Sequence, residues 1–164
     1  MILHCVEAAA DGGENELMDP ELMYILLREA NPDHIAALMR PDAMIIPGNA
    51  EDGYEARTDS AGPVFMVMAD GTLHMRFTDR KRNIVWSDAP EVQAAVAALK
   101  TILANEGEDS AGCVLRHCLT SGQGLVCNNV LHNRRGFSDG TGGQQAQGKR
   151  KLFRARYHDR VAGT

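Results

Sequence analysis

Residues 125–137 read LVCNNVLHNRRGF, and residues 149–160 read KRKLFRARYHDR. The first stretch places His132 at the end of an apolar run, which is typical of a buried strand. The second stretch alternates basic and apolar side chains, which predicts a closing strand over 151–157. Together they predict that the C-terminal part of the chain brings one imidazole and several guanidinium groups onto two strands.

The closing strand sorts its side chains into two faces, because successive residues of a strand point to opposite sides. At about 3.3 Å per residue, Arg150 and Arg154 lie about 13 Å apart on one face. A guanidinium binds a carboxylate through two parallel hydrogen bonds, so this face is a candidate anion site. On spacing alone, the more usual explanation is a solvated edge strand whose charges prevent edge pairing. The face is formed by Arg150, Leu152, Arg154, Arg156 and His158.

The bulk composition is that of one soluble globular domain, with 164 residues, 44% hydrophobic and 24% charged. The formal net charge of -5 is unevenly distributed. Residues 1–60 carry thirteen acidic and three basic side chains, whereas residues 134–160 carry eight of the 17 lysines and arginines. The basic segment fits nucleic acid or an anionic small molecule, and the overall acidity argues against nucleic acid.

The four cysteines contain no CxxC pair, so we expect reduced, mostly buried thiols in a cytoplasmic protein. No apolar stretch reaches the length of a membrane span, and the N-terminal apolar run is too short for a signal peptide. We therefore expect no membrane partner. The sequence leaves the oligomeric state open, a homo-oligomer included.

The remaining segments alternate helix and strand signals. Asp19-Pro20 and Asn31-Pro32 each combine an N-cap residue with proline at the first helical position, and a third helix is expected over 90–105. Asp70-Gly71 predicts a hairpin. Strands are expected over 2–6, 43–46, 64–68, 73–77, 114–119 and 125–131. The expected apolar face of the first helix consists of Leu22, Met23, Ile25 and Leu26.

Residues 124–160 resemble the C-terminal part of the taurine dioxygenase-like (TauD/TfdA-like) family of Fe(II)/2-oxoglutarate-dependent dioxygenases. Gly12-Gly13-Glu14-Asn15 is similar to the Gly-Gly-acid-Thr turn of that family. The resemblance implies a mainly β fold with helical insertions (α+β), a partial double-stranded β-helix or jelly roll of the clavaminate synthase-like type. It implies one domain over residues 1–164.

The resemblance also implies roles for single residues. His132 matches a metal ligand, and Arg150 and Arg154 match an arginine pair that contacts 2-oxoglutarate, Arg154 at the distal carboxylate. Asn15 stands where the family has a threonine, so its amide is the expected co-substrate contact. The implied cofactor is Fe(II), the co-substrates are 2-oxoglutarate and O2, and the implied reaction is hydroxylation or related C–H oxidation of a small molecule.

The chain departs from the family pattern at the other two metal ligands, which are a histidine and a carboxylate in a His-x-Asp or His-x-Glu motif. None of the six histidines has an acidic residue two positions later. In the family that motif lies before the segment where this chain starts. We therefore expect the chain to be the C-terminal part of a longer dioxygenase domain; the alternative is a short relative without a metal site. The residues at those positions are Val6, Ala36, Arg76, Leu119, Arg134 and Arg160.

Other sequence patterns give weaker indications of function. Residues 143–149 satisfy the spacing GxxxxGK of a phosphate-binding loop, but Arg150 replaces the required Ser or Thr, and a strand is expected where that loop needs a helix. His117 and Cys118 are adjacent on a predicted strand, so they point to opposite faces and do not form a shared metal site. The alternative function from another class is a non-catalytic β-roll domain that binds an anion or nucleic acid.

Overall fold

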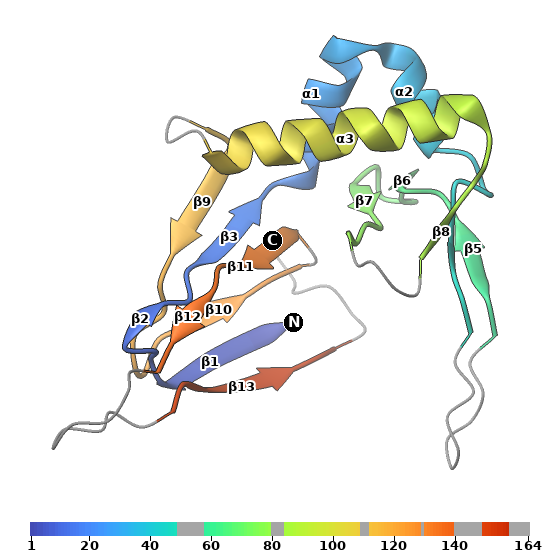
Figure 1. Cartoon of the computed structure of the whole chain (residues 1–164). Helices are drawn as coiled ribbons and strands as arrows, with labels where there is room; N and C mark the ends of the chain where they lie inside the picture. Colours follow the sequence, from blue (N-terminus) through green and yellow to red (C-terminus); the bar gives the residue numbers. More distant parts are fainter. Residues whose placement is uncertain (49–57, 80–83, 109–111, 129, 140–148, 158–164) are drawn as a thin grey trace, which may run out of the picture. The chain divides into compact units, whose positions relative to one another are not determined.

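The computed structural model describes residues 1–48, 58–79, 84–108, 112–128, 130–139 and 149–157. The chain divides into two compact units. The first combines Met1–Asp19 with Gly112–Thr164, and the second consists of Pro20–Ala111. The first unit is built from strands, whereas the second contains all three described helices and several short strands (Figure 1).

The described strands of the first unit form three antiparallel sheets, in the orders β10-β1-β13, β11-β3-β9 and β12-β2 (Figure 1). Strands from both ends of the unit's sequence therefore lie side by side. The strands are β1 (Ile2–Glu7), β2 (Asp11–Gly12), β3 (Asn15–Met18), β9 (Val114–His117), β10 (Gly124–Val126), β11 (Leu131–Arg134), β12 (Phe137–Ser138) and β13 (Lys151–Ala155).

The second unit contains a three-stranded sheet in the order β5-β4-β8 and a β6-β7 hairpin. The predicted Asp70-Gly71 turn is confirmed, and Gly71 has a φ of 84°. The predicted helix starts at Pro20, Pro32 and Pro90 are also confirmed. The elements are α1 (Pro20–Ala30), α2 (Pro32–Leu38), α3 (Pro90–Glu108), β4 (Met44–Ile46), β5 (Ser60–Gly62), β6 (Phe65–Val67), β7 (Leu73–Met75) and β8 (Val85–Trp86).

The buried face of α1 differs from the prediction. Met23 and Leu27 are fully buried, whereas Leu22 and Ile25 are 38% and 47% exposed. The helix contacts α2, α3 and β7, and Tyr24 packs edge-on against Phe65. These contacts turn the helix so that a different stripe of apolar side chains faces the core of the second unit.

The predicted single strand over 125–131 is wrong, because β10 and β11 belong to different sheets. The backbone N–H of Cys127 donates to the Met1 carbonyl at 2.8 Å, which ends the pairing with β1. The Tyr157 hydroxyl donates to the Cys127 carbonyl at 3.1 Å. The chain then changes sheets, and Leu131 pairs with Met18. His132 is therefore the second residue of a new strand and does not end a long one.

The sheet β10-β1-β13 has one covered and one open face. Leu3 and Cys5 are covered, while Ile2 and His4 are exposed. Directly paired residues of an antiparallel sheet point to the same side. Because Leu3 pairs with Arg154, the guanidinium of Arg154 leaves the strand on the covered face. The predicted alternation along β13 is thus confirmed. Leu152 and Arg154 lie on the covered face, and Phe153, which pairs with the exposed His4, lies on the open face.

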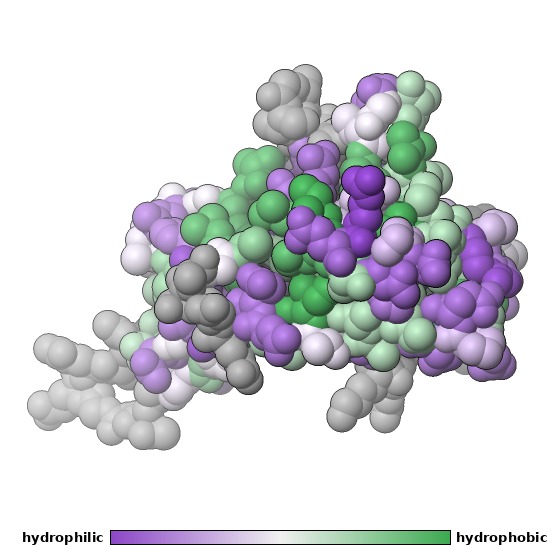
Figure 2. All heavy atoms as spheres, turned by 90° about the horizontal axis from the view of Figure 1, so that it is seen from above, coloured by the Kyte–Doolittle hydropathy of each residue, from purple (hydrophilic) through white to green (hydrophobic). Residues whose placement is uncertain are grey.

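Apolar side chains also reach the molecular surface, as the green residues among hydrophilic ones show in Figure 2. In the first unit, Ile2 and Val126 pair on the open face of β1 and β10, and they are 41% and 57% exposed. None of the four cysteines forms a disulfide, and Cys5 and Cys127 are buried. None of the helices in the described ranges has the length and apolar character that crossing a membrane requires.

The close packing around Gly12 leads to a testable prediction. Gly12 has a φ of 73°, and a Cβ there would lie 2.5 Å from the carbonyl oxygen of Gly136, which is backbone and cannot move aside. We expect Gly12→Ala to lower the free energy of unfolding by about 1–3 kcal/mol, measured by urea denaturation. Gly122→Ala is the control, because Gly122 has a similar φ of 86° but open space around it. Equal losses in both variants would refute the steric part of this explanation.

Candidate functional site

His132 lies on β11, in the sheet β11-β3-β9. It pairs with Leu17, so its side chain shares a face with Leu17 and, two residues along, Asn15. The imidazole contacts the side chain of Cys127, which directly follows β10. Since β10 belongs to the sheet β10-β1-β13, this contact joins the two sheets and fixes the direction in which His132 points.

The ring of His132 is held in a way that suits a metal ligand. Its Nδ1 lies 2.9 Å from the carbonyl oxygen of Val130, a geometry in which Nδ1–H donates. That hydrogen bond engages Nδ1, and metal-ligating histidines of this kind generally bind the metal through the other ring nitrogen, which is Nε2 here. Contact with Cys127 raises the pKa of His132; burial opposes this rise, and the Val130 carbonyl adds to it.

The described residues do not contain a complete metal site. Within them, no three His, Cys, Asp or Glu side chains gather into a group that could hold a metal ion. An iron site that includes His132 would need at least one ligand from outside the described residues.

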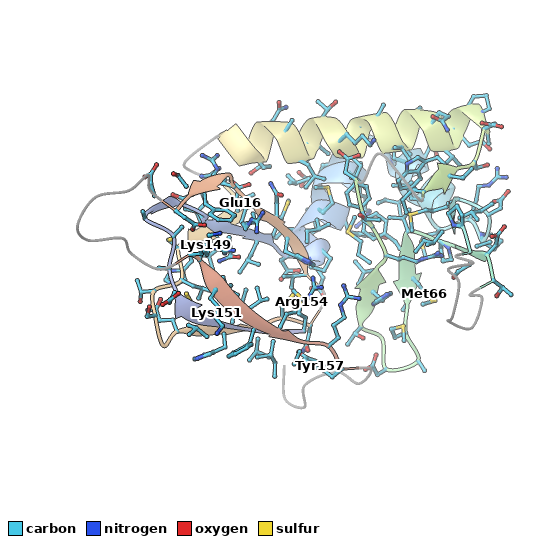
Figure 3. The ribbon with its side chains drawn as sticks, turned by 60° about the horizontal axis from the view of Figure 1, so that its bottom comes forward. Glu16, Met66, Lys149, Lys151, Arg154 and Tyr157 are labelled. Atoms are coloured by element: carbon cyan, nitrogen blue, oxygen red, sulfur yellow. The ribbon has the colours of Figure 1, made fainter. Side chains whose placement is uncertain are left out.

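Arg154 occupies the middle of β13, on the covered face of the sheet β10-β1-β13. Figure 3 shows Lys149, Lys151, Arg154 and Tyr157 following one another along the C-terminal segment that contains β13. The guanidinium of Arg154 is exposed, and within the described residues no carboxylate forms an ion pair with it. Arg154 and His132 thus come from different sheets of one unit.

Arg150 lies just before β13 and so falls outside the alternation predicted for that strand. Its backbone N–H donates to Asp139 at 2.9 Å. Its guanidinium carbon lies 5.0 Å from the centre of the Phe137 ring. A Cβ on Gly13 would lie 3.3 Å from the Nε of Arg150, so the glycine leaves room for the arginine side chain.

Asn15 is buried, with 6% of its surface exposed. Its Nδ2 donates to the carbonyl oxygen of His117 at 3.2 Å. An amide nitrogen carries two hydrogens, so one donor remains for a ligand. Asn15 pairs directly with Arg134, and both side chains lie on the face of His132.

The opposite face of the same sheet carries a network of charges centred on Glu16, which Figure 3 labels on β3. Its carboxylate accepts hydrogen bonds from Arg135 at 2.7 Å, Arg116 at 3.2 Å and Asn133 at 3.2 Å. Burial alone would raise the pKa of Glu16, but these hydrogen bonds outweigh it, and the net pKa lies below the ordinary value of 4.5. The network ties β9 and β11 to the central strand.

We expect Glu16→Gln to lower the free energy of unfolding by about 1.5–3 kcal/mol at neutral pH, because three donors lose a charged acceptor. Since the pKa of Glu16 is lowered on folding, its contribution is complete above pH 4.5 and is lost as the pH falls further. Urea denaturation at several pH values tests both points. Glu7→Gln, at an exposed position, is the control. If the difference in unfolding free energy between the unaltered chain and Glu16→Gln does not shrink in acid, the charge-based explanation is disproved.

The structure adds two residues that the sequence interpretation missed. Arg134 was considered only as a non-acidic residue two positions after His132, although that spacing already places both on one strand face. The guanidinium carbon of Arg134 lies 4.8 Å from the centre of the Phe137 ring, the ring that also contacts Arg150. No motif in the sequence signals that Phe137 joins these two arginines.

Comparison with curated proteins finds relatives of one kind. A uridine-5'-phosphate dioxygenase from Amycolatopsis sp is 31% identical over 166 residues, covering 95% of this chain and 54% of the relative. A uridine-5'-phosphate dioxygenase from Streptomyces sp is 28% identical over 141 residues, covering 84% of this chain and 50% of the relative. The chain thus spans about half the length of the curated relatives it matches.

Solved structures show the same fold at low sequence identity. The non-heme iron oxygenase OrfP in complex with Fe has a TM-score of 0.60 and 15% identity, over 92% of this chain and 43% of that protein. An asparagine oxygenase in complex with Fe(II), 2S,3S-3-hydroxyasparagine and succinate has a TM-score of 0.56 and 16% identity, over 92% of this chain and 42% of that protein. The predicted mainly β, jelly-roll fold with helical insertions is confirmed.

The family model of the taurine catabolism dioxygenases, TauD and TfdA, matches residues 1–156. This match covers nearly the whole chain, both of its compact units, and the segments that carry Asn15, His132, Arg150 and Arg154. The chain belongs to the TauD/TfdA dioxygenase family.

Proposed function

We propose that this chain forms the C-terminal part of the site of an Fe(II)/2-oxoglutarate-dependent dioxygenase. The observation that carries the proposal is the imidazole of His132, which donates from Nδ1 to the Val130 carbonyl, so that a metal would bind through Nε2. Arg154 supports the proposal because it lies on a second sheet of the same unit, without an ion pair in the described part of the chain. A carboxylate and a further histidine would complete the metal site from outside the described residues.

The roles of the chain's own residues follow from their chemistry. Bound Fe(II), with 2-oxoglutarate and O2, would supply the oxidising power for a C–H bond, as in the rest of the family. His132 would hold the metal through Nε2. Arg154 would fix the distal carboxylate of 2-oxoglutarate with two parallel hydrogen bonds, and Arg150 would add positive charge. Asn15 would donate its second amide hydrogen to 2-oxoglutarate. The two sheets would exclude water from the site.

We further propose a nucleoside 5'-phosphate as the class of small-molecule substrate. The support is the name of the two relatives, both uridine-5'-phosphate dioxygenases, and the identity of 31% across 95% of this chain to one of them. The excess of basic side chains over 134–160 suits an anionic small molecule better than a neutral one.

The test is an anaerobic titration with Fe(II) in the presence of 2-oxoglutarate, followed by the visible charge-transfer band of the chelated metal. It is carried out on the 164-residue chain and on the longest in-frame polypeptide that contains it. We expect a band in at least one of the two, and oxygen-dependent consumption of 2-oxoglutarate that uridine 5'-phosphate stimulates.

Three other outcomes would count against the proposal or a part of it. Absence of the band from both polypeptides, while both are folded by circular dichroism, would reject the metal site. A salt-sensitive shift with oligonucleotides in place of the band would favour a non-catalytic domain that binds nucleic acid. A band with no response to uridine 5'-phosphate would reject the substrate class and leave the metal site intact.

A further inference from the structure

The second unit holds the side chain of Arg76 in a fixed position beside β5. Arg76 directly follows β7, in the hairpin on which Figure 3 labels Met66. Its backbone N–H donates to the Val64 carbonyl at 2.7 Å, which fixes the point where the side chain leaves the hairpin. Its Nη2 donates to the Ser60 carbonyl and, at 3.3 Å, to the Ser60 hydroxyl. The guanidinium is therefore anchored to β5 through one of its three nitrogens.

The charge of Arg76 is not neutralised within the described residues. None of the ion pairs found there includes Arg76, whereas Arg40 of the same unit pairs with both Asp42 and Glu91. Ser60 offers Arg76 only neutral acceptors. Burial lowers the pKa of Arg76, because the partly buried guanidinium loses hydration that no carboxylate replaces. A bound anion would supply the missing countercharge.

The remaining donors around Arg76 suit an oxyanion. Both side-chain hydrogen bonds use Nη2, so Nε and Nη1 keep hydrogens that no described residue accepts. The Ser60 hydroxyl accepts from Nη2 and still has its own hydrogen to donate. Gly62 provides the space for Nη1, because a Cβ at that residue would lie 2.7 Å from it. Charge-assisted donors and a hydroxyl thus lie together on one short strand and the end of a hairpin.

An aromatic pair adjoins Arg76 in the second unit. Phe77 directly follows Arg76, and its ring lies 6.0 Å from the ring of Trp86 at an interplanar angle of 37°. Both aromatic residues are partly buried, so each keeps some accessible surface. Nucleobases stack on aromatic side chains whatever their sequence, because every base has a flat π-face. A cation next to aromatic surface is the combination that a ligand with an anionic end and a flat base requires.

We propose that Arg76 and Ser60 bind the 5'-phosphate of a nucleoside phosphate, and that Phe77 and Trp86 provide the surface on which its base stacks. This inference rests on the proposed function for the class of substrate, and it adds residues of the second unit to that function. A phosphate monoester suits this site because it offers three acceptor oxygens and a charge of about −1.5 to −2 at neutral pH.

The test measures binding to the metal-free 164-residue chain by titration calorimetry, with uridine 5'-phosphate, uridine and inorganic phosphate as the probes. Trp86 is the single tryptophan, so its fluorescence reports whether a ligand reaches the second unit. We expect uridine 5'-phosphate to bind and to change this fluorescence, and inorganic phosphate to compete with it. Uridine should bind at least about 10-fold more weakly, because it lacks the anionic end.

Three variants separate the charge of Arg76 from its position. Arg76→Met should weaken uridine 5'-phosphate binding about 10- to 100-fold, and Arg76→Lys should lie in between because an ammonium cannot replace the separate guanidinium donors. Gly62→Ala keeps the charge and places a methyl group against Nη1. The backbone of Gly62 lies outside the left-handed region, so alanine is compatible with its conformation. We expect this displacement of the guanidinium to weaken binding about 3- to 10-fold.

Arg40→Met is the matched control, because it removes an arginine of the same unit that Asp42 and Glu91 already neutralise. We expect it to leave the affinity for uridine 5'-phosphate unchanged. The proposal is overturned by equal weakening in Arg40→Met and Arg76→Met, by equal affinities for uridine and uridine 5'-phosphate, or by absence of binding to a chain that circular dichroism shows to be folded. Loss of binding in Arg154→Met but not in Arg76→Met would move the phosphate to the closing strand and overturn it as well.

Binding without metal separates this inference from the proposed function. Arg76-dependent binding, with no charge-transfer band in either polypeptide, would keep the phosphate site and reject the iron site. The reverse result is a charge-transfer band and a consumption of 2-oxoglutarate that uridine 5'-phosphate stimulates equally in the unaltered chain and in Arg76→Met. That result would keep the proposed function and overturn the phosphate site.

Discussion

Replacing His132 with alanine should weaken Fe(II) binding in the presence of 2-oxoglutarate by at least about 100-fold, because the variant loses a direct metal ligand and not merely an outer contact. The measurement is the anaerobic charge-transfer titration of the metal-competent polypeptide. The substitution also removes the hydrogen bonds of the imidazole with Cys127 and the Val130 carbonyl, so we expect the free energy of unfolding to fall by about 1–2 kcal/mol, which leaves the variant folded for the titration.

His4→Ala is the matched control for this experiment. His4 is also an exposed histidine on a strand of the first unit, but it lies on the open face of β10-β1-β13. We expect its removal to leave the titration unaltered. An unchanged metal affinity in the His132 variant would mean that this imidazole is not a ligand, and the assignment of the whole site would then fall.

Replacing Arg154 with methionine should raise the dissociation constant of 2-oxoglutarate about 10- to 100-fold, because a forked, charge-assisted contact with the distal carboxylate is lost. Fe(II) affinity measured without the co-substrate should stay the same, which distinguishes this variant from the His132 variant. Arg154→Lys should recover only part of the affinity.

Lys151→Met is the control for Arg154, since it removes a positive charge from the same strand. The ammonium of Lys151 lies 5.5 Å from the centre of the Phe153 ring, and Phe153 points to the open face of the sheet. Weakening of 2-oxoglutarate binding by the same factor in both variants would indicate a general effect of charge and would contradict a specific contact of Arg154.

Much of the fold could be predicted from the sequence because its signals are local. Proline after an N-cap residue placed the starts of α1 and α2, and Asp70-Gly71 placed the β6-β7 turn. The buried stripe of α1 could not be predicted in the same way. Leu22 and Leu27 are equally apolar, and only the packing of α1 against the rest of its unit decides which one is buried.

The break between β10 and β11 had no local signal either. The apolar run 125–131 is as suitable for one strand as for two, and the break arises from long-range bonds of Cys127 to Met1 and Tyr157. For the candidate site, the alternation of β13 correctly placed Arg154. The convergence of Arg134 and Arg150 on Phe137 brings residues 134–137 together with Arg150 from a later segment, so no local spacing rule could have found it.

The position of β1 at the centre of its sheet has a consequence for folding. Leu3 pairs with Leu125 on one side and with Arg154 on the other, so this ladder joins segments that are far apart in the sequence. Because such long-range pairings form only after a large loop of chain has closed, we expect this sheet to assemble late and slowly during folding.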